Sequence, residues 1–384
     1  MPTRFATDWQ AASKNDDGEA VRRPRHTTLH TSSFEMKIPL SRLLVPSCTT
    51  TSSSCCCCCA QILSPRGRSK VAFRIQKRRL NAASDNDTRG SRTRKGKVVA
   101  LLGIPNDDNS SFLKGCDKAP PLIRNALHSP SSNYWSESGI DLGSLAATVV
   151  HDDDKNDDGE VAKGWIDLGD LNFTNNNNSQ ALTPPFEIID KAVESSLVKG
   201  RRILSLGGDH AITYPLVKAY SRHFPLLNIL HIDAHPDLYD SLDGNYHSHA
   251  SPFARIMENN HSSRLVQVGI RTMNGHQQEQ ANRFGVEVMP MKDFDPSIVD
   301  TLDDGPLYVS LDLDGLDPAY CPGVSHHEPG GLSTRQVLDM IQRIRVPIVG
   351  ADIVEYNPSR DINGMTAAVA AKLVKELLAK MIDP

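Results

Sequence analysis

The feature that most constrains the fold is an alternation of short apolar runs with segments of helical periodicity, which continues from residue 202 to the C-terminal end. Short apolar runs indicate buried strands, and the longer periodic segments indicate amphipathic helices. Strands that alternate with helices form a mostly parallel sheet covered on both faces, so we expect a three-layer α-β-α domain of the α/β class. The expected strands are 98–104, 165–170, 202–206, 228–232, 265–269, 286–289, 307–311 and 347–351, and the expected helices are 119–127, 185–198, 210–220, one ending near 284, 334–344 and 364–382.

The N-terminal third differs from the rest in composition. Residues 36–84 contain no acidic residue, but they carry nine lysines and arginines among many serines and threonines. A basic, serine-rich and acid-poor segment is typical of an organelle transit peptide. We therefore expect residues 1–94 to be a disordered region that contains a transit peptide, with the mitochondrion ahead of plastid and cytoplasm as the destination. A disordered basic tail is the alternative.

Residues 95–384 are expected to form one domain of this α/β class. Two low-complexity tracts interrupt it, an acidic one near 151–160 and an asparagine-rich one near 174–180. Both are interpreted as exposed loop insertions, because the acids of the first tract lack the spacing of a calcium-binding EF-hand loop.

Overall charge and cysteine content narrow the class of protein. The formal net charge is −4, and no apolar run approaches the roughly 20 residues of a membrane helix, so neither nucleic acid nor a membrane is an expected partner. Five of the eight cysteines are consecutive, Cys55 to Cys59, which rules out an ordinary disulfide framework. Residues 95–384 therefore have the cysteine usage of a protein from a reducing compartment.

Metal-type side chains follow the expected strand 228–232. Asp233, His235 and Asp237 stand at alternate positions, so they point the same way if the extended geometry persists. Buried carboxylates are costly unless they are paired or bound to a cation. The pattern therefore indicates a metal site, with a turn of solvated acids as the alternative.

Three more residues of the same kind, His210, Asp312 and Asp314, also lie where expected strands end. Ligands bind at the carboxyl edge of open α/β sheets, so all six side chains converge if their strands are neighbours. Four carboxylates and two imidazoles carry too much negative charge for one divalent ion and suit two. An oxygen-rich set without thiolates favours Mn²⁺ over Zn²⁺, with Mg²⁺ less suitable and Co²⁺ or Ni²⁺ left open.

These residues belong to three motifs that resemble the signatures of the ureohydrolase (arginase/agmatinase) family. The motifs are Gly-Gly-Asp-His at 207–210, Asp-Ala-His-Pro-Asp at 233–237 and Ser-Leu-Asp-Leu-Asp-Gly-Leu-Asp-Pro at 310–318. The resemblance covers roughly residues 97–382, and the stretches 248–255, 322–326 and 364–372 are most similar to plant-type arginases.

The resemblance implies an arginase-like fold, two Mn²⁺ ions per subunit and a homo-oligomer, trimeric or hexameric. It also implies which residues bind each ion. His210 and Asp237 would bind one ion and His235 and Asp314 the other, while Asp233 and Asp312 bridge the two.

A guanidinium carbon is a poor electrophile, and the expected reaction is attack by hydroxide that a pair of metal ions generates from water. Glu355 matches the family glutamate that pairs with the guanidinium group, and His249 lies at the family position of a proton-shuttling histidine. The alternatives are a surface acid and a loop histidine, and His247 is a neighbour that could be confused with His249. Asp209 is a candidate partner of a ligand histidine, and Asp352 could have the same role or hold a turn. Asp317 is expected to be structural, and His326 and His327 are not expected to be ligands.

The expected substrate is a small cationic guanidino compound. Animal-type arginases grip the amino-acid end of arginine with an asparagine and an aspartate, where this chain has Tyr239 and the segment 272–274. We therefore place agmatine, which would give urea and putrescine, slightly ahead of L-arginine, which would give urea and ornithine. Guanidinobutyrate and guanidine follow. The alternatives from other classes are a related zinc deacetylase and a non-catalytic binding protein targeted to an organelle.

Overall fold

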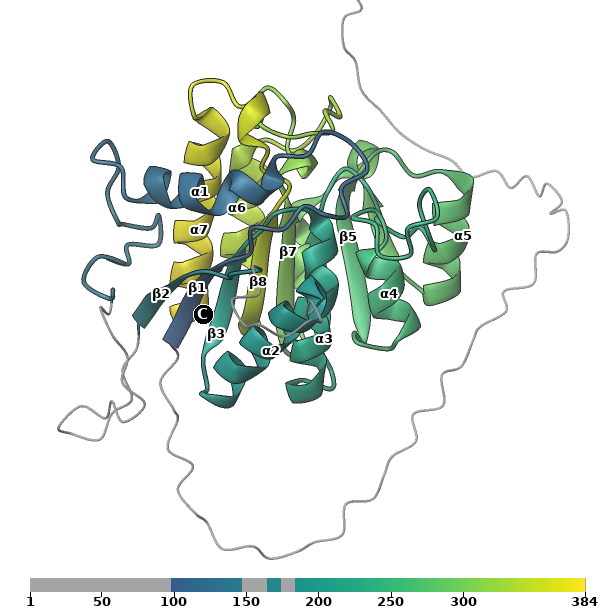
Figure 1. Ribbon diagram of the computed structural model, residues 1–384, viewed down its shortest axis with the longest axis horizontal. Coiled ribbons are helices and arrows are strands. Elements are labelled where there is room, and N and C mark those ends of the chain that lie inside the picture. Colours follow the sequence, from purple (N-terminus) through teal and green to yellow (C-terminus); the bar gives the residue numbers. More distant parts are fainter. Residues whose placement is uncertain (1–97, 147–163, 174–183, 384) are drawn as a thin grey trace, which may run out of the picture. The chain divides into compact units, whose positions relative to one another are not determined.

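The computed structural model describes residues 98–146, 164–173 and 184–383 (Figure 1). These residues all belong to the second of two units into which contacts divide the chain, Met1–Asp85 and Asn86–Pro384. The expected transit peptide and both low-complexity insertions lie outside the described residues.

The described residues form one eight-stranded sheet in which all neighbouring strands are parallel. The strand order across the sheet is β2-β1-β3-β8-β7-β4-β5-β6. The predicted fold class is therefore confirmed. The strands are β1 Val98–Gly103, β2 Gly164–Asp170, β3 Arg202–Leu206, β4 Asn228–Ile232, β5 Arg264–Ile270, β6 Glu287–Pro290, β7 Leu307–Asp312 and β8 Ile348–Val354.

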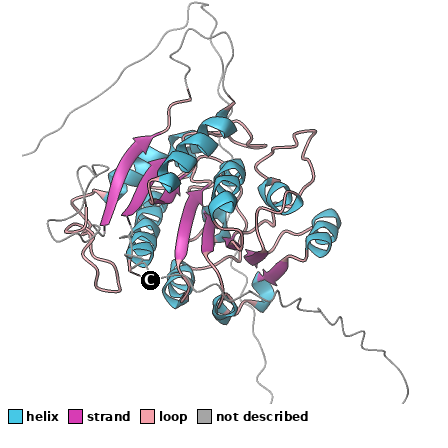
Figure 2. Ribbon diagram, turned by 90° about the horizontal axis from the view of Figure 1, so that it is seen from below, coloured by secondary structure: helices cyan, strands magenta, loops and turns pink. Residues whose placement is uncertain are grey.

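Helices cover both faces of this sheet (Figures 1 and 2). Successive side chains of a strand point to opposite faces, so Leu204 of β3 packs in one apolar cluster and its neighbour Ile203 in the other. The first cluster includes α1 Ala119–Leu127, α6 Thr334–Arg343 and α7 Met365–Ile382, and the second includes α2 Pro185–Val198, α3 Thr213–His223, α4 Pro252–Glu258 and α5 Gly275–Phe284. None of the described helices is both long enough and apolar enough to cross a membrane.

Local sequence explains where several helices begin. Pro185 and Pro252 occupy the first positions of α2 and α4, where a missing N–H costs nothing. Ser333 and Gln336 form a capping box at the start of α6. The bounds of α1 and α2 agree with the predicted ranges, whereas α4 was not predicted.

Four adjacent strands of the sheet, β3, β8, β7 and β4, lie in register at their carboxyl ends. Leu311 of β7 pairs with Ile353 of β8 on one side and Ile232 of β4 on the other, and Leu206 of β3 also pairs with Ile353. The residues that follow these strands therefore emerge side by side. This arrangement brings together the six side chains that the sequence identified as metal ligands.

Candidate metal centre and active site

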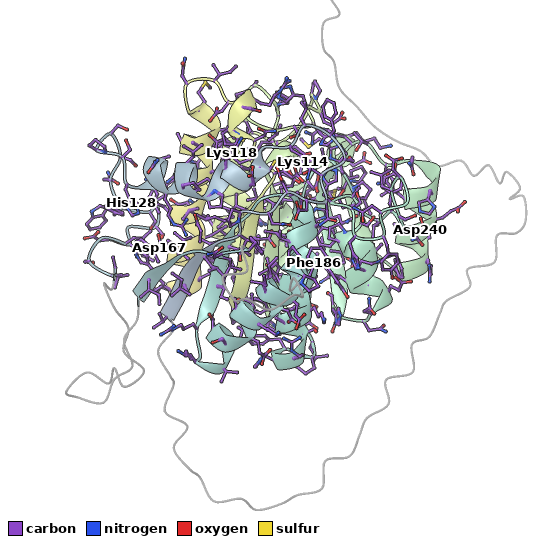
Figure 3. All side chains as sticks on the ribbon, viewed as in Figure 1. Lys114, Lys118, His128, Asp167, Phe186 and Asp240 are labelled. Atoms are coloured by element: carbon purple, nitrogen blue, oxygen red, sulfur yellow. The ribbon has the colours of Figure 1, made fainter. Side chains whose placement is uncertain are left out.

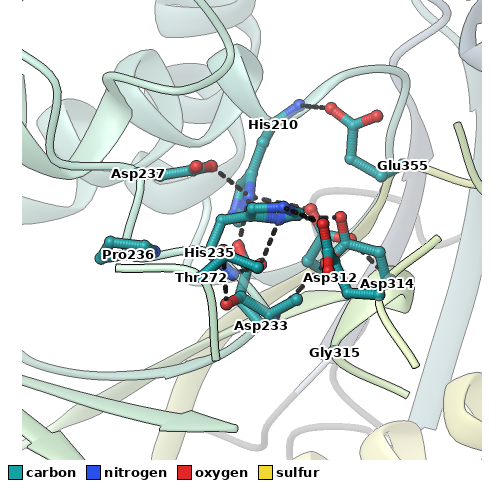
Figure 4. A network of polar contacts seen from close by, with 12 residues as sticks. His210, Asp233, His235, Pro236, Asp237, Thr272, Asp312, Asp314, Gly315 and Glu355 are labelled. Atoms are coloured by element: carbon teal, nitrogen blue, oxygen red, sulfur yellow. Dashed lines mark hydrogen bonds and ion pairs between the residues drawn. The ribbon is translucent and has the colours of Figure 1, made fainter. Parts of the chain in front are cut away.

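The six predicted ligands lie together at the carboxyl edge, and Figure 4 shows the four aspartates pointing toward His210 and His235. All except His235 are buried. Asp237 has a left-handed backbone conformation, with φ of 49°. A non-glycine residue is held in this conformation only when its surroundings enforce it, and such residues cluster at functional sites.

One cluster surrounds the imidazole of His210. Its Nε2–H donates to Ser310 Oγ at 3.0 Å, because that hydroxyl itself donates to a carboxylate, so Nδ1 is the ring nitrogen that faces the cluster. Nδ1 has no hydrogen-bond partner although it is buried. It nevertheless faces three carboxylate oxygens, of Asp237 at 3.0 Å, Asp312 at 3.1 Å and Asp233 at 3.2 Å. Burial opposes a charge on His210, but the three carboxylates prevail and raise its pKa well above the usual range, so the cluster favours positive charge at this place.

A second cluster surrounds His235. Its Nδ1 lies 3.0 Å from Asp314 Oδ2 and 3.4 Å from Asp233 Oδ1, so Asp233 contacts both imidazoles through different oxygens. Burial, together with repulsion from Asp233, raises the pKa of Asp314 to about 6. Burial and neighbouring carboxylates likewise raise the pKa of Asp312 well above its usual range. These carboxylates are thus unfavourable as anions without a compensating positive charge.

The donor set therefore fits two divalent cations that share Asp233. Two groups of described residues bring ligand atoms within 4.8 Å of one another, one around His210 and one around His235. The first group also includes His231, but both ring nitrogens of His231 are already engaged in hydrogen bonds. His231 is accordingly a support for the site and not a ligand.

His231 and Gln267 are functional candidates that the sequence analysis missed. Gln267 Nε2 donates to His231 Nδ1 at 3.0 Å, so the opposite nitrogen of His231 carries the proton and donates to Asp233 Oδ2 at 2.7 Å. The same amide donates to the Pro236 carbonyl at 2.6 Å, inside the ligand stretch. The signal for His231 was present, because it precedes Asp233 by two residues and period-two spacing places both on one side of β4. No local pattern indicates Gln267, because it lies on β5 and contacts His231 on the neighbouring strand β4.

We expect Gln267→Leu to weaken Mn²⁺ binding about 10- to 100-fold, the effect of losing a partner that orients a ligand. The variant leaves His231 free to change tautomer and turn away from Asp233. Calorimetric titration with Mn²⁺ would measure the loss. Gln280→Leu is the matched control, since Gln280 is also buried but lies on α5. Equal Mn²⁺ affinities in the two variants would contradict the assignment.

Asp352 supports the other imidazole. Its Oδ1 accepts the hydroxyl of Ser310 at 2.7 Å, which links it to His210. Its Oδ2 accepts from Tyr308 and Thr213 at 2.7 and 3.0 Å. This contact matches one of the two roles expected for Asp352. Ser310, like His231, lies two residues before a predicted ligand.

Glu355 and His249 form a buried pair beside the predicted metal ligands. His249 Nδ1 lies 2.9 Å from Glu355 Oε1, which also accepts the backbone N–H of His210 at 2.9 Å. Burial opposes both charges, but attraction to Glu355 prevails and raises the pKa of His249 to about 9. The same attraction lowers the pKa of Glu355 to about 2. Glu355 also has a left-handed backbone, with φ of 64°.

The segment between β1 and α1 contacts this pair. Ser111 Oγ lies 2.8 Å from His249 Nε2, and the thiol of Cys116 donates to Glu355 Oε2 at 3.5 Å. Neither contact could be predicted, because both residues are more than 100 positions away in the sequence. Gly208 permits the close approach of this connection, since a Cβ there would lie 1.9 Å from the Asn106 carbonyl oxygen.

A cavity of about 290 Å³ opens above the site. Metal-ligand candidates form part of its lining, together with Glu355 and His249. Tyr239 and Thr272, which stand where animal-type arginases differ, also line it, whereas Asn274 caps α5 and donates to the Tyr239 hydroxyl at 2.6 Å. The remaining lining residues are Ser111, Leu242, Ala250, Gln277, His326 and Glu328.

The other residues singled out from the sequence have structural surroundings. Asp209 accepts the backbone N–H groups of Asn109 and Ala211 and contacts no ligand histidine by a hydrogen bond. Asp317 accepts three backbone N–H groups, as expected of a structural residue. His247 is exposed and lies outside the lining of the cavity. His326 lines the cavity without belonging to either ligand group, and His327 contacts the Pro322 carbonyl.

Comparisons with known proteins agree with this geometry. A family model described as the arginase family matches residues 97–379. Arginase 1, mitochondrial, of Arabidopsis thaliana is 44% identical over 291 residues, which are 74% of this chain and 81% of that protein. An agmatinase of Bacillus anthracis is 32% identical over 73% of this chain and 90% of that protein. The solved structure of an arginase from Medicago truncatula superposes with a TM-score of 0.64 and 40% identity, covering 74% of this chain and 88% of that chain. The chain therefore belongs to the arginase family, whose members are metal-dependent hydrolases that act on small guanidino substrates.

Proposed function

We propose that this protein is a ureohydrolase that uses two Mn²⁺ ions per subunit to hydrolyse a cationic guanidino compound and release urea. The observation that carries the proposal is the convergence of four carboxylates and two imidazoles beneath a cavity that also holds the Glu355–His249 pair. The donors are oxygen-rich and include no thiolate, which supports Mn²⁺ over Zn²⁺.

When bound, a pair of divalent cations supplies Lewis acidity that makes water nucleophilic at neutral pH. The carboxylate of Glu355 binds the guanidinium group and orients its carbon, since a planar guanidinium can donate two parallel N–H bonds to one carboxylate. His249 holds a proton at neutral pH, because its pKa is raised to about 9. That proton is available to the amine that leaves as urea is released.

L-Arginine is the first candidate substrate, because the Arabidopsis and Medicago relatives are named arginases. Agmatine is the second, and the cavity itself favours it. Among the described residues that line the cavity there is no lysine or arginine to pair with an α-carboxylate. Purified protein assayed with Mn²⁺ and each compound would rank the two.

Removal of metal should abolish urea release, and added Mn²⁺ should restore it. We expect Zn²⁺ and Mg²⁺ to restore less, since the ligands combine hard oxygens with imidazole. The measurement is urea formation after chelation, dialysis and titration with each ion. Full activity in a preparation shown by elemental analysis to be metal-free would overturn the proposal, and release of acetate from acetylated amines in place of urea would favour a deacetylase.

The mitochondrion is the proposed location. The acid-poor segment 36–84 predicts a transit peptide, and the similar Arabidopsis arginase is named mitochondrial. A fluorescent fusion to the full chain would test import. The trimer or hexamer implied by the resemblance stays a prediction, which sedimentation analysis would check.

A further inference from the structure

One carboxylate of the cavity wall is not accounted for by metal binding or by recognition of the guanidinium. Of the acidic lining residues, Asp237 and Asp312 face His210, and Glu355 pairs with His249. The fourth is Glu328. Its nearest charged partner among the described residues is His235 Nε2, at 3.8 Å, too far for a hydrogen bond. About a third of the Glu328 side chain, 37%, is exposed.

The backbone that carries Glu328 is firmly held. Its carbonyl accepts two hydrogen bonds from Arg271, from Nε at 2.9 Å and Nη2 at 2.6 Å. Two and three residues further on, the backbone N–H groups of Gly330 and Gly331 donate to Asp317 Oδ2 at 2.6 and 3.1 Å. The backbone position of Glu328 is therefore set before any ligand binds, which lowers part of the entropic cost of recognition.

The charges around the cavity define what Glu328 can bind. Glu355 serves the guanidinium end of a substrate. The wall otherwise offers neutral donors and acceptors, such as Tyr239, Thr272 and Gln277, and no lysine or arginine among the described lining residues. Lys114 and Lys118, on the β1–α1 connection, are exposed and lie outside the lining (Figure 3). A second anionic group in such a cavity is complementary to a second positive charge on the substrate.

We propose that Glu328 is a specificity-determining residue that binds the ammonium group at the far end of the substrate, the terminal amine of agmatine or the α-amine of arginine. This inference rests on the proposed ureohydrolase function. It predicts a preference for guanidino compounds with an ammonium tail over those with an uncharged tail, and discrimination against tails that carry only a carboxylate.

The test compares two matched pairs of substrates that differ by one amine. Agmatine is paired with butylguanidine, and L-arginine with 5-guanidinopentanoate. In the Mn²⁺-loaded full chain, Glu328→Gln should lower kcat/KM about tenfold for whichever amine-bearing compound is the substrate, mostly through KM. The compound without the amine should change less than about twofold. Glu279→Gln, an exposed acid on α5, is the control and should leave all four values unchanged.

The Mn²⁺ affinity of the variant distinguishes a role of Glu328 in substrate recognition from a role in supporting the metal site. If Glu328 served to orient His235, the variant would bind Mn²⁺ more weakly and lose activity equally on both members of a pair. We expect its Mn²⁺ affinity by calorimetry to match the wild-type value. Equal losses on paired substrates, or no loss on either, would overturn the proposal.

The outcome also distinguishes this inference from the proposed function. If Glu328→Gln releases urea with the same preference within each substrate pair as the wild type, only the role of Glu328 is rejected. Failure of the wild-type protein to release urea from any of the four compounds would reject the ureohydrolase function. Calorimetric titration with agmatine and butylguanidine needs no turnover, and equal affinities in that experiment would then reject the role of Glu328 as well.

Discussion

Asp312→Asn should lower urea release by more than about a thousandfold while leaving the metal-free protein at least as stable as the wild type. The loss follows because an amide cannot supply the negative charge that holds a cation between His210 and its neighbours, and the cations contribute several kcal/mol to such a reaction. The oxygen of the substituted amide can still accept the backbone N–H of Asp314, which Asp312 Oδ1 binds at 2.8 Å in the wild type.

The stability of the metal-free variant follows from the same contacts. Asp312 is a buried carboxylate among other carboxylates, 3.1 Å from Nδ1 of His210. Burial and the neighbouring carboxylates raise the pKa of Asp312 well above its usual range, so a neutral amide at that place removes a charge that is unfavourable without a cation. Thermal unfolding should show an equal or higher Tm without metal and a much smaller rise on adding Mn²⁺. Asp303→Asn, in an exposed loop, is the control. A variant that keeps the full Mn²⁺-dependent rise would contradict the assignment of Asp312 as a ligand.

Glu355→Gln should lower urea release by more than about a hundredfold with Mn²⁺ affinity nearly unchanged. The amide oxygen can still accept the N–H of His210, so the loop keeps its shape. The variant loses the charge that attracts the guanidinium group and the charge that keeps His249 protonated. Because burial alone lowers the pKa of a histidine, the pKa of His249 should fall from about 9.

Two measurements check this prediction. Steady-state kinetics on the preferred substrate should show both a higher KM and a lower kcat, since Glu355 acts in binding and through His249. NMR titration of the histidines should show one resonance whose pKa falls relative to the wild type. Activity within a few-fold of the wild-type value would remove Glu355 from the substrate site. A large loss of Mn²⁺ affinity would instead make it part of the metal centre.

The sequence predicted the strands and most helices because the physical signals for them are local. Apolar runs and helical periodicity each extend over a few residues; they matched the bounds of α1 and α2 and, to within one residue, those of every strand except β8. The helix α4 was not predicted because it spans only seven residues, too few to show helical periodicity. Strand β8 is longer than expected and reaches Val354, so Asp352 lies within the strand and only Glu355 follows it.

A local pattern can identify supporting residues on the same strand as a predicted ligand, but not those that come from another strand. His231 and Ser310 share a strand face with Asp233 and Asp312, and the period of two could have identified them. Ser111, Gln267 and Glu328 reach the site from other connections or strands. Their approach depends on which strands are neighbours, and no local pattern encodes that order.

The amino-acid sequence by itself determined the α/β class, the six metal-type side chains and their places at strand ends, because side-chain chemistry and backbone periodicity are properties of short segments. Only the tertiary structure decided that β3, β8, β7 and β4 are adjacent and in register. That order sets the distances between the two ligand clusters and the contact of His210 with Ser310, while loop contacts to Arg271 and Asp317 place Glu328. Contacts between residues far apart in the chain arise from packing of the whole sheet, so they become visible only once it is assembled.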